Sequence, residues 1–77
     1  MNIENVEDVL LAEDLLPMLK VEADSKNLKV FVFDNDELKK YFTPKSDTLG
    51  VALLAKDEDN ALYNFKNLRK CYLIRFK

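Results

Sequence analysis

The most constraining feature of this sequence is a run of seven residues, Leu49–Ala55, without a charged or hydrogen-bonding side chain. A short, continuous apolar run is typical of a strand that is buried on both faces. Polar residues bound the run, with a loop over residues 43–48 before it and a turn over residues 57–60 after it. The sequence therefore predicts a buried strand at Leu49–Ala55, which the rest of the chain has to cover.

The N-terminal segment predicts a helix over residues 6–16. Asn5 is a good N-cap residue, and Glu7 and Asp8 would lie in the first turn, where the helix dipole favours acidic side chains. Pro17 disfavours helical geometry in the residue before it, so we expect the helix to end at Leu16.

Residues 18–34 predict a β-hairpin. Apolar residues alternate with charged ones over residues 19–24, and the sequence Asp-Ser-Lys-Asn at 24–27 is typical of a turn. The segment 28–33 is β-branched and aromatic on both of its faces, which predicts a central strand.

The remaining segments predict one short helix and two further strands. The helix covers residues 36–42, with acidic residues first and lysines later, and a clear strand covers residues 71–76. Residues 61–68 fit a strand or a helix, and we favour the strand because the asparagines at positions 60, 64 and 67 and two aromatic residues weaken the helix.

Together these segments predict one small α+β domain over residues 1–77, in the order α-β-β-α-β-β-β. Short connections favour an antiparallel sheet of about four to five strands, with two helices packed against one face. The expected core comprises Val6, Leu10, Leu16, Val30, Val32, Leu38, Phe42, Val51, Leu53, Ile74 and Phe76.

The composition argues against an enzyme. The chain has no histidine, one cysteine and one glycine, which excludes histidine-based acid–base chemistry, a Cys/His zinc site and a glycine-rich phosphate loop. A chain of 77 residues needs nearly all its apolar side chains for one core, so we expect little to remain for lining a ligand cavity. We therefore expect no catalytic residue, no metal and no cofactor.

The sequence predicts a cytoplasmic protein. The first residues are acidic rather than basic, and no apolar stretch long enough for a signal peptide or a membrane span follows them. The unpaired Cys71 fits a reducing compartment. We expect no membrane partner.

Charge is distributed unevenly along the chain, although the net charge is only −2. Residues 1–24 contain seven acidic residues and one lysine, whereas residues 66–77 contain five basic residues and no acidic one. An acidic beginning and a basic end suggest that charge contributes to binding.

The leading hypothesis is a small non-enzymatic regulatory module that occupies a surface of a partner protein. The acidic residues would present a negative surface that steers a basic partner into place. In size and charge, though not in any motif, the chain resembles small acidic phage-encoded inhibitors that occupy the nucleic-acid groove of an enzyme. The expected partner-binding residues are Glu4, Glu7, Asp8, Glu13 and Asp14.

The alternative hypothesis is a small RNA- or DNA-binding domain that uses the basic C-terminal segment. Aromatic residues nearby, Tyr63, Phe65 and Tyr72, could stack on bases. A third interpretation has the acidic and basic segments neutralise each other, within the fold or across a homodimer. The expected nucleic-acid-binding residues are Lys66, Arg69, Lys70, Arg75 and Lys77.

Three short patterns have a structural explanation that we prefer to a chemical one. Residues 31–36 resemble the nucleophile strand of haloacid-dehalogenase-type phosphatases, but a strand end followed by a helix cap explains them as well. Residues 57–60 are acidic but lack the spacing of a calcium loop. Cys71 lacks a histidine base, so we interpret it as a buried small apolar group.

Overall fold

In the computed structural model, which describes residues 9–44 and 46–76, the apolar run forms strand β3 (Leu49–Ala55) at the centre of a sheet. Strands β2 (Lys29–Phe33) and β4 (Cys71–Arg75) flank β3, and both are antiparallel to it. All residues of β3 except Leu54 are buried. The predicted buried strand is confirmed, and its side chains are apolar on both faces because helices cover both.

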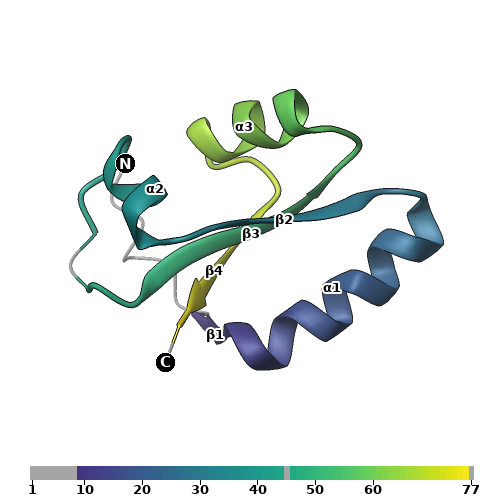
Figure 1. Ribbon diagram of the computed structural model, residues 1–77, viewed down its shortest axis with the longest axis horizontal. Helices are drawn as coiled ribbons and strands as arrows, with labels where there is room; N and C mark the ends of the chain where they lie inside the picture. Colours follow the sequence, from purple (N-terminus) through teal and green to yellow (C-terminus); the bar gives the residue numbers. More distant parts are fainter. Residues whose placement is uncertain (1–8, 45, 77) are drawn as a thin grey trace.

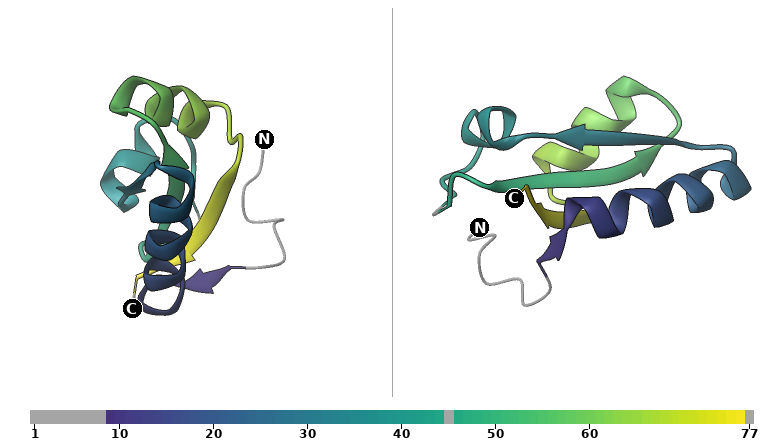
Figure 2. Two further views of the ribbon diagram at one scale, coloured as in Figure 1. Left: turned by 90° about the vertical axis from the view of Figure 1, so that its right-hand side faces the viewer. Right: turned by 60° about the horizontal axis from the view of Figure 1, so that its bottom comes forward.

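Within the described residues, the sheet has four strands in the order β1-β4-β3-β2, and it is mixed rather than purely antiparallel. The additional strand, β1 (Leu10–Leu11), runs parallel to β4, with Leu10 opposite Ile74. Three helices of the described part of the chain cover the sheet, α1 on one face and α2 and α3 on the other (Figures 1 and 2). The prediction of two helices packed against one face is therefore wrong. The element order is β-α-β-α-β-α-β.

Helix α1 (Ala12–Lys26) replaces both the end of the predicted first helix and the first strand of the predicted hairpin. The alternation over residues 19–24 is part of a longer helical pattern, because the buried side chains are three or four positions apart. These buried residues are Ala12, Leu15, Leu19 and Ala23.

Pro17 lies inside α1 and does not end it. Proline removes the N–H that would bond the carbonyl of Glu13, but Pro17 is exposed, so water can reach the freed carbonyl. The helix ends at Asn27, which adopts the left-handed conformation with φ 57° and whose N–H donates to Ala23 and Asp24 carbonyls. Packing of the apolar stripe against the sheet therefore outweighs the local preference of proline.

Helices α2 (Asn35–Lys39) and α3 (Glu58–Lys66) both begin at an aspartate that caps them. The Asp34 carboxylate accepts from the N–H of Glu37 at 3.0 Å, and the Asp57 carboxylate accepts from the N–H of Asn60 at 2.8 Å. The preferred strand over residues 61–68 is therefore wrong and the helical alternative is correct, since the cap fixes where the helix begins.

Strand β2 lies at the edge of the sheet, so the prediction that segment 28–33 is central is wrong. Its odd-numbered phenylalanines, Phe31 and Phe33, pack against the α2/α3 side, and Val30 packs against the α1 side. Helices on both faces thus make an edge strand apolar on both sides. The pattern of apolar side chains along a strand shows whether its two faces are covered by other layers. It does not show whether the strand has a neighbour on each side in the sheet.

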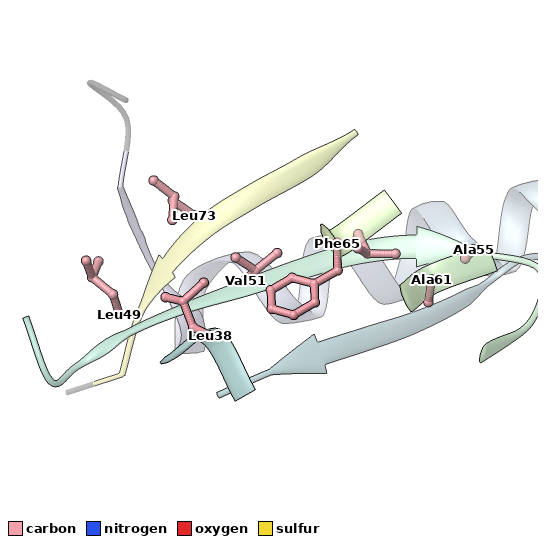
Figure 3. Packing of buried hydrophobic residues seen from close by; sticks show 8 residues of the cluster. Leu38, Leu49, Val51, Ala55, Ala61, Phe65 and Leu73 are labelled. Atoms are coloured by element: carbon pink, nitrogen blue, oxygen red, sulfur yellow. The ribbon is translucent and has the colours of Figure 1, made fainter. Parts of the chain in front are cut away.

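Two apolar clusters fill the spaces above and below the sheet. The cluster on the α2/α3 side, shown in Figure 3, is built from Leu38, Leu49, Val51, Leu53, Ala55, Ala61, Phe65 and Leu73. The cluster on the α1 side is built from Ala12, Leu15, Leu19, Ala52 and Ile74.

The predicted core is confirmed in part. Leu38, Val51, Leu53 and Ile74 are buried. Four others, Leu16, Val30, Phe42 and Phe76, are half-buried and pack against the two clusters. The prediction that Leu10 and Val32 belong to the core is wrong, because each lies on an edge strand and is 43% exposed. Val6 lies outside the described residues.

Candidate functional site

The structure describes two of the five predicted acidic residues. Glu13 and Asp14 are exposed in the first turn of α1, where carboxylates also stabilise the helix dipole. Glu4, Glu7 and Asp8 lie outside the described residues, as does most of the predicted first helix.

The predicted basic residues are divided between the two ends of β4. Lys66 ends α3, with its Nζ 5.0 Å from the centre of the Tyr41 ring, and the exposed Arg69 and Lys70 follow it in the loop before β4. Arg75 is the last residue of β4, about 16 Å beyond Lys70 at the usual rise per strand residue. Lys77 lies outside the described residues.

Ion pairs between described residues are local and do not join the acidic to the basic segment. Exposed pairs of this kind contribute little to stability. The pairs are Lys26–Glu22 at 2.9 Å, Lys40–Glu37 at 3.1 Å and Lys39–Asp47 at 3.7 Å.

The Cys71 thiol is held in its neutral form. Burial raises the pKa of this thiol to about 11. Its Sγ also donates to the backbone carbonyls of Arg69 at 3.2 Å and Asn64 at 3.4 Å. Since the thiolate is the reactive species, this environment supports the interpretation of Cys71 as a structural residue.

The acidic patterns serve as helix caps. Asp34 and Asp57, which suggested phosphatase or calcium chemistry, each accept a hydrogen bond from a helix backbone as described above. Within residues 9–44 and 46–76, no group of three or more cysteine or acidic side chains is arranged to hold a metal ion.

The hydrogen bonding of β3 shows which neighbouring strand each of its residues faces with its backbone N–H and C=O groups. The N–H of Phe76 donates to the carbonyl of Thr48 at 2.7 Å, in continuation of the β3–β4 register. Because strand residues direct their N–H and C=O groups to alternate sides, the even-numbered residues of β3 face β4. The odd-numbered residues of β3 therefore face β2.

The free edge of the sheet at β2 follows from this alternation. The residues of β2 that lie opposite the odd-numbered residues of β3 are Lys29, Phe31 and Phe33, and these bond to β3. The N–H and C=O groups of Val30 and Val32 consequently point away from the sheet. Among the described strands, β2 pairs only with β3, so these groups form an open edge.

An apolar groove of about 420 Å³ runs beside this edge, between α1 and β2. Lys20, Asp24 and Lys29 stand at its margins. Its apolar lining consists of Leu16, Ala23, Leu28, Val30 and Val32. The open edge and the groove together form the groove surface, at which backbone hydrogen bonds and apolar contacts are available side by side.

A second concavity, the cleft, lies at the end of the sheet, between α1 and α3. It has a volume of about 710 Å³, so the expectation that too few residues remain to line a cavity is wrong. The error arose from counting apolar residues, whereas this cleft is lined largely by polar ones. Sequence reasoning missed Lys26 and Lys56, which the fold brings beside the predicted Lys70.

Comparison of the chain with protein-family models, with curated proteins and with solved structures finds no match. None of the described helices has the length and apolar character needed to cross a membrane.

Proposed function

We propose that this chain is a small binding module that acts by occupying a surface of a partner protein, without catalysing a reaction. The observation that carries the proposal is the open edge of β2 beside an apolar groove. An extended segment of the partner would extend the sheet by bonding to the outward backbone groups of Val30 and Val32. Every second side chain of that segment would enter the groove.

The lining of the groove surface indicates the chemistry of this segment. Its floor is apolar, and the described residues at its margins are Lys20 and Lys29, with Asp24 as their one carboxylate. We therefore expect alternating apolar residues together with at least one acidic residue. Charge of this kind selects the partner and its register more than it adds affinity.

The acidic residues have a separate role in this proposal. Glu13 and Asp14, with the acidic residues that precede them in the sequence, would accelerate the encounter with a basic partner surface. An inhibitor that blocks the nucleic-acid groove of an enzyme is one form of this function.

The test uses a substitution that removes one outward N–H and leaves the sheet intact. Val32→Pro eliminates an edge donor that β3 does not use, and an edge strand tolerates proline at such a position. Val32→Thr keeps the donor and the shape and is the matched control. The tagged proteins are used to capture partners from a nuclease-treated cell lysate, with the fold of each variant checked by circular dichroism.

We expect the wild-type chain and Val32→Thr to retain one protein that Val32→Pro loses. Equal capture by all three proteins would contradict the proposed edge. Binding that disappears after nuclease treatment would favour nucleic acid instead. A concentration-dependent dimer in sedimentation, abolished by Val32→Pro, would identify a second copy of the chain as the occupant.

A further inference from the structure

The cleft lies at the end of the sheet where β3 ends and β4 begins. Glu22 and Lys26 line it from the last turns of α1, and Asn60 and Asn64 line it from α3 on the opposite side of the sheet. Figure 1 shows these two helices on opposite faces, reaching the same end of β3. Its volume of about 710 Å³ falls within the range of small-molecule sites.

Positive charge converges on the cleft from three separate elements. Lys26 ends α1, Lys56 follows β3 and Lys70 precedes β4. Among the described residues that line the cleft, only Glu22 carries a carboxylate, and it is already paired with Lys26 at 2.9 Å. Neither Lys56 nor Lys70 pairs with a carboxylate of the described residues, so the side chains that line the cleft carry more positive than negative charge, although Asp57, Glu58 and Asp59 follow Lys56 at the start of α3.

The loop that presents Lys70 has an unusual backbone. Leu68 and Lys70 both adopt the left-handed region, with φ of 49° and 55°. Residues other than glycine rarely do so, and such conformations concentrate at ligand sites, where the surrounding structure maintains them. The loop thus places Lys70 at the mouth of the cleft at some conformational cost.

The rest of the lining suits a flat polar ring. Asn60 and Asn64 are one helical turn apart, and neither side-chain amide bonds to another described residue. Tyr72 is 40% exposed and offers an aromatic face. Leu28, Leu54 and Ala55 form an apolar floor.

We propose that the cleft binds a nucleotide. Lys56 and Lys70 would hold its phosphates, since ammonium groups form strong charge-assisted hydrogen bonds with phosphate oxygens. The base would lie against Tyr72 and the apolar floor, with the two asparagine amides bonding to its polar edge. This binding goes beyond the proposed function, because the linings of the cleft and of the groove surface have only Leu28 in common.

The experiment titrates the ¹⁵N-labelled chain with adenosine diphosphate, without added metal, and follows the amide signals by NMR. We expect saturable shifts of Asn60, Asn64 and Tyr72. The variant Lys56→Glu/Lys70→Glu should weaken binding at least tenfold, which corresponds to ~1.4 kcal/mol. The matched control Lys39→Glu/Lys40→Glu makes the same change in net charge at the C-terminal end of α2 and should bind as the wild type does.

Two further probes test whether both parts of the ligand contribute. Pyrophosphate and adenosine should each bind more weakly than adenosine diphosphate. The proposal is overturned if adenosine diphosphate gives no saturable shift up to about 10 mM, where even a millimolar complex would be nearly saturated. It is also overturned if both charge-reversal variants lose affinity equally, or if pyrophosphate binds as tightly as the nucleotide. No partner protein is present in this assay, so failure here leaves the proposed function unaffected.

Discussion

The two faces of the sheet are packed in different ways. On the α2/α3 face, Phe65 lies at the centre of an aromatic group. Its ring stacks on Phe33 with centroids 4.1 Å apart and meets Tyr41 and Phe42 edge-on at 5.7 Å and 5.8 Å. Two helices and these large rings close this face.

On the other face, α1 packs through two leucines, Leu15 and Leu19, together with smaller residues. Ala12, Ala23 and Ala52 are buried there, and Gly50 lies where a side chain would overlap the Phe76 ring and the Phe33 carbonyl. Two concavities border α1, the groove between α1 and β2 and the cleft at the end of the sheet. The aromatic face therefore supplies most of the packing of large rings, whereas the groove surface lies on the α1 face and the cleft lies at the end of the sheet, between α1 and α3.

The largest expected loss of stability comes from removing the ring at the centre of the aromatic group. Phe65→Ala should lower the free energy of unfolding by ~3–5 kcal/mol, because it removes a fully buried ring and leaves a cavity. Urea unfolding followed by circular dichroism measures the loss. Tyr63→Ala, on the same helix but 55% exposed, should change stability by no more than about 0.5 kcal/mol. Similar losses from both substitutions would contradict the central role of Phe65.

A smaller loss of stability is expected from adding a side chain at Gly50, on the α1 side of the sheet. Gly50→Ala should destabilise the fold by ~1–3 kcal/mol, since its methyl group meets Phe76 and backbone that cannot move freely. A double-mutant cycle with Phe76→Ala measures the coupling between the two residues. Strictly additive losses would show that Phe76 does not impose the need for glycine.

The smallest change in stability should follow from replacing the proline inside α1. Pro17→Ala restores a backbone donor to the exposed second turn of the helix, which should raise the free energy of unfolding by about 1 kcal/mol. Thermal unfolding of the variant and the wild type provides the measurement. A lower midpoint for Pro17→Ala would mean that the proline ring itself stabilises this face.

Elements with strong local signals were predictable from the sequence. The run Leu49–Ala55, the strand near 71–76 and the short helix after Asp34 have the expected character. The errors occurred where tertiary packing decides between two local patterns. Residues 19–23 fit both periodicities, and Pro17 is accepted because the helix gains more from the sheet than it loses at the proline. The two-residue strand β1 is too short to give any periodic signal.

The candidate surfaces were less predictable than the fold. The acidic and basic segments were visible as charge runs, but the lysines of the cleft come from positions 26, 56 and 70 and meet only through topology. The open edge depends on strand order, because the side chains of β2 look like those of a central strand. Neither property can be obtained from local composition.

The pairing of β1 with β4 has a consequence for how the chain folds. Leu10 lies opposite Ile74, 64 positions later, whereas Phe33 and Val51 are 18 positions apart. Closing the longer loop costs more chain entropy, and two residues of β1 provide few hydrogen bonds in return. We therefore expect β2, β3 and β4 to assemble early and β1 to dock late. The start of α1 becomes anchored only in that final step.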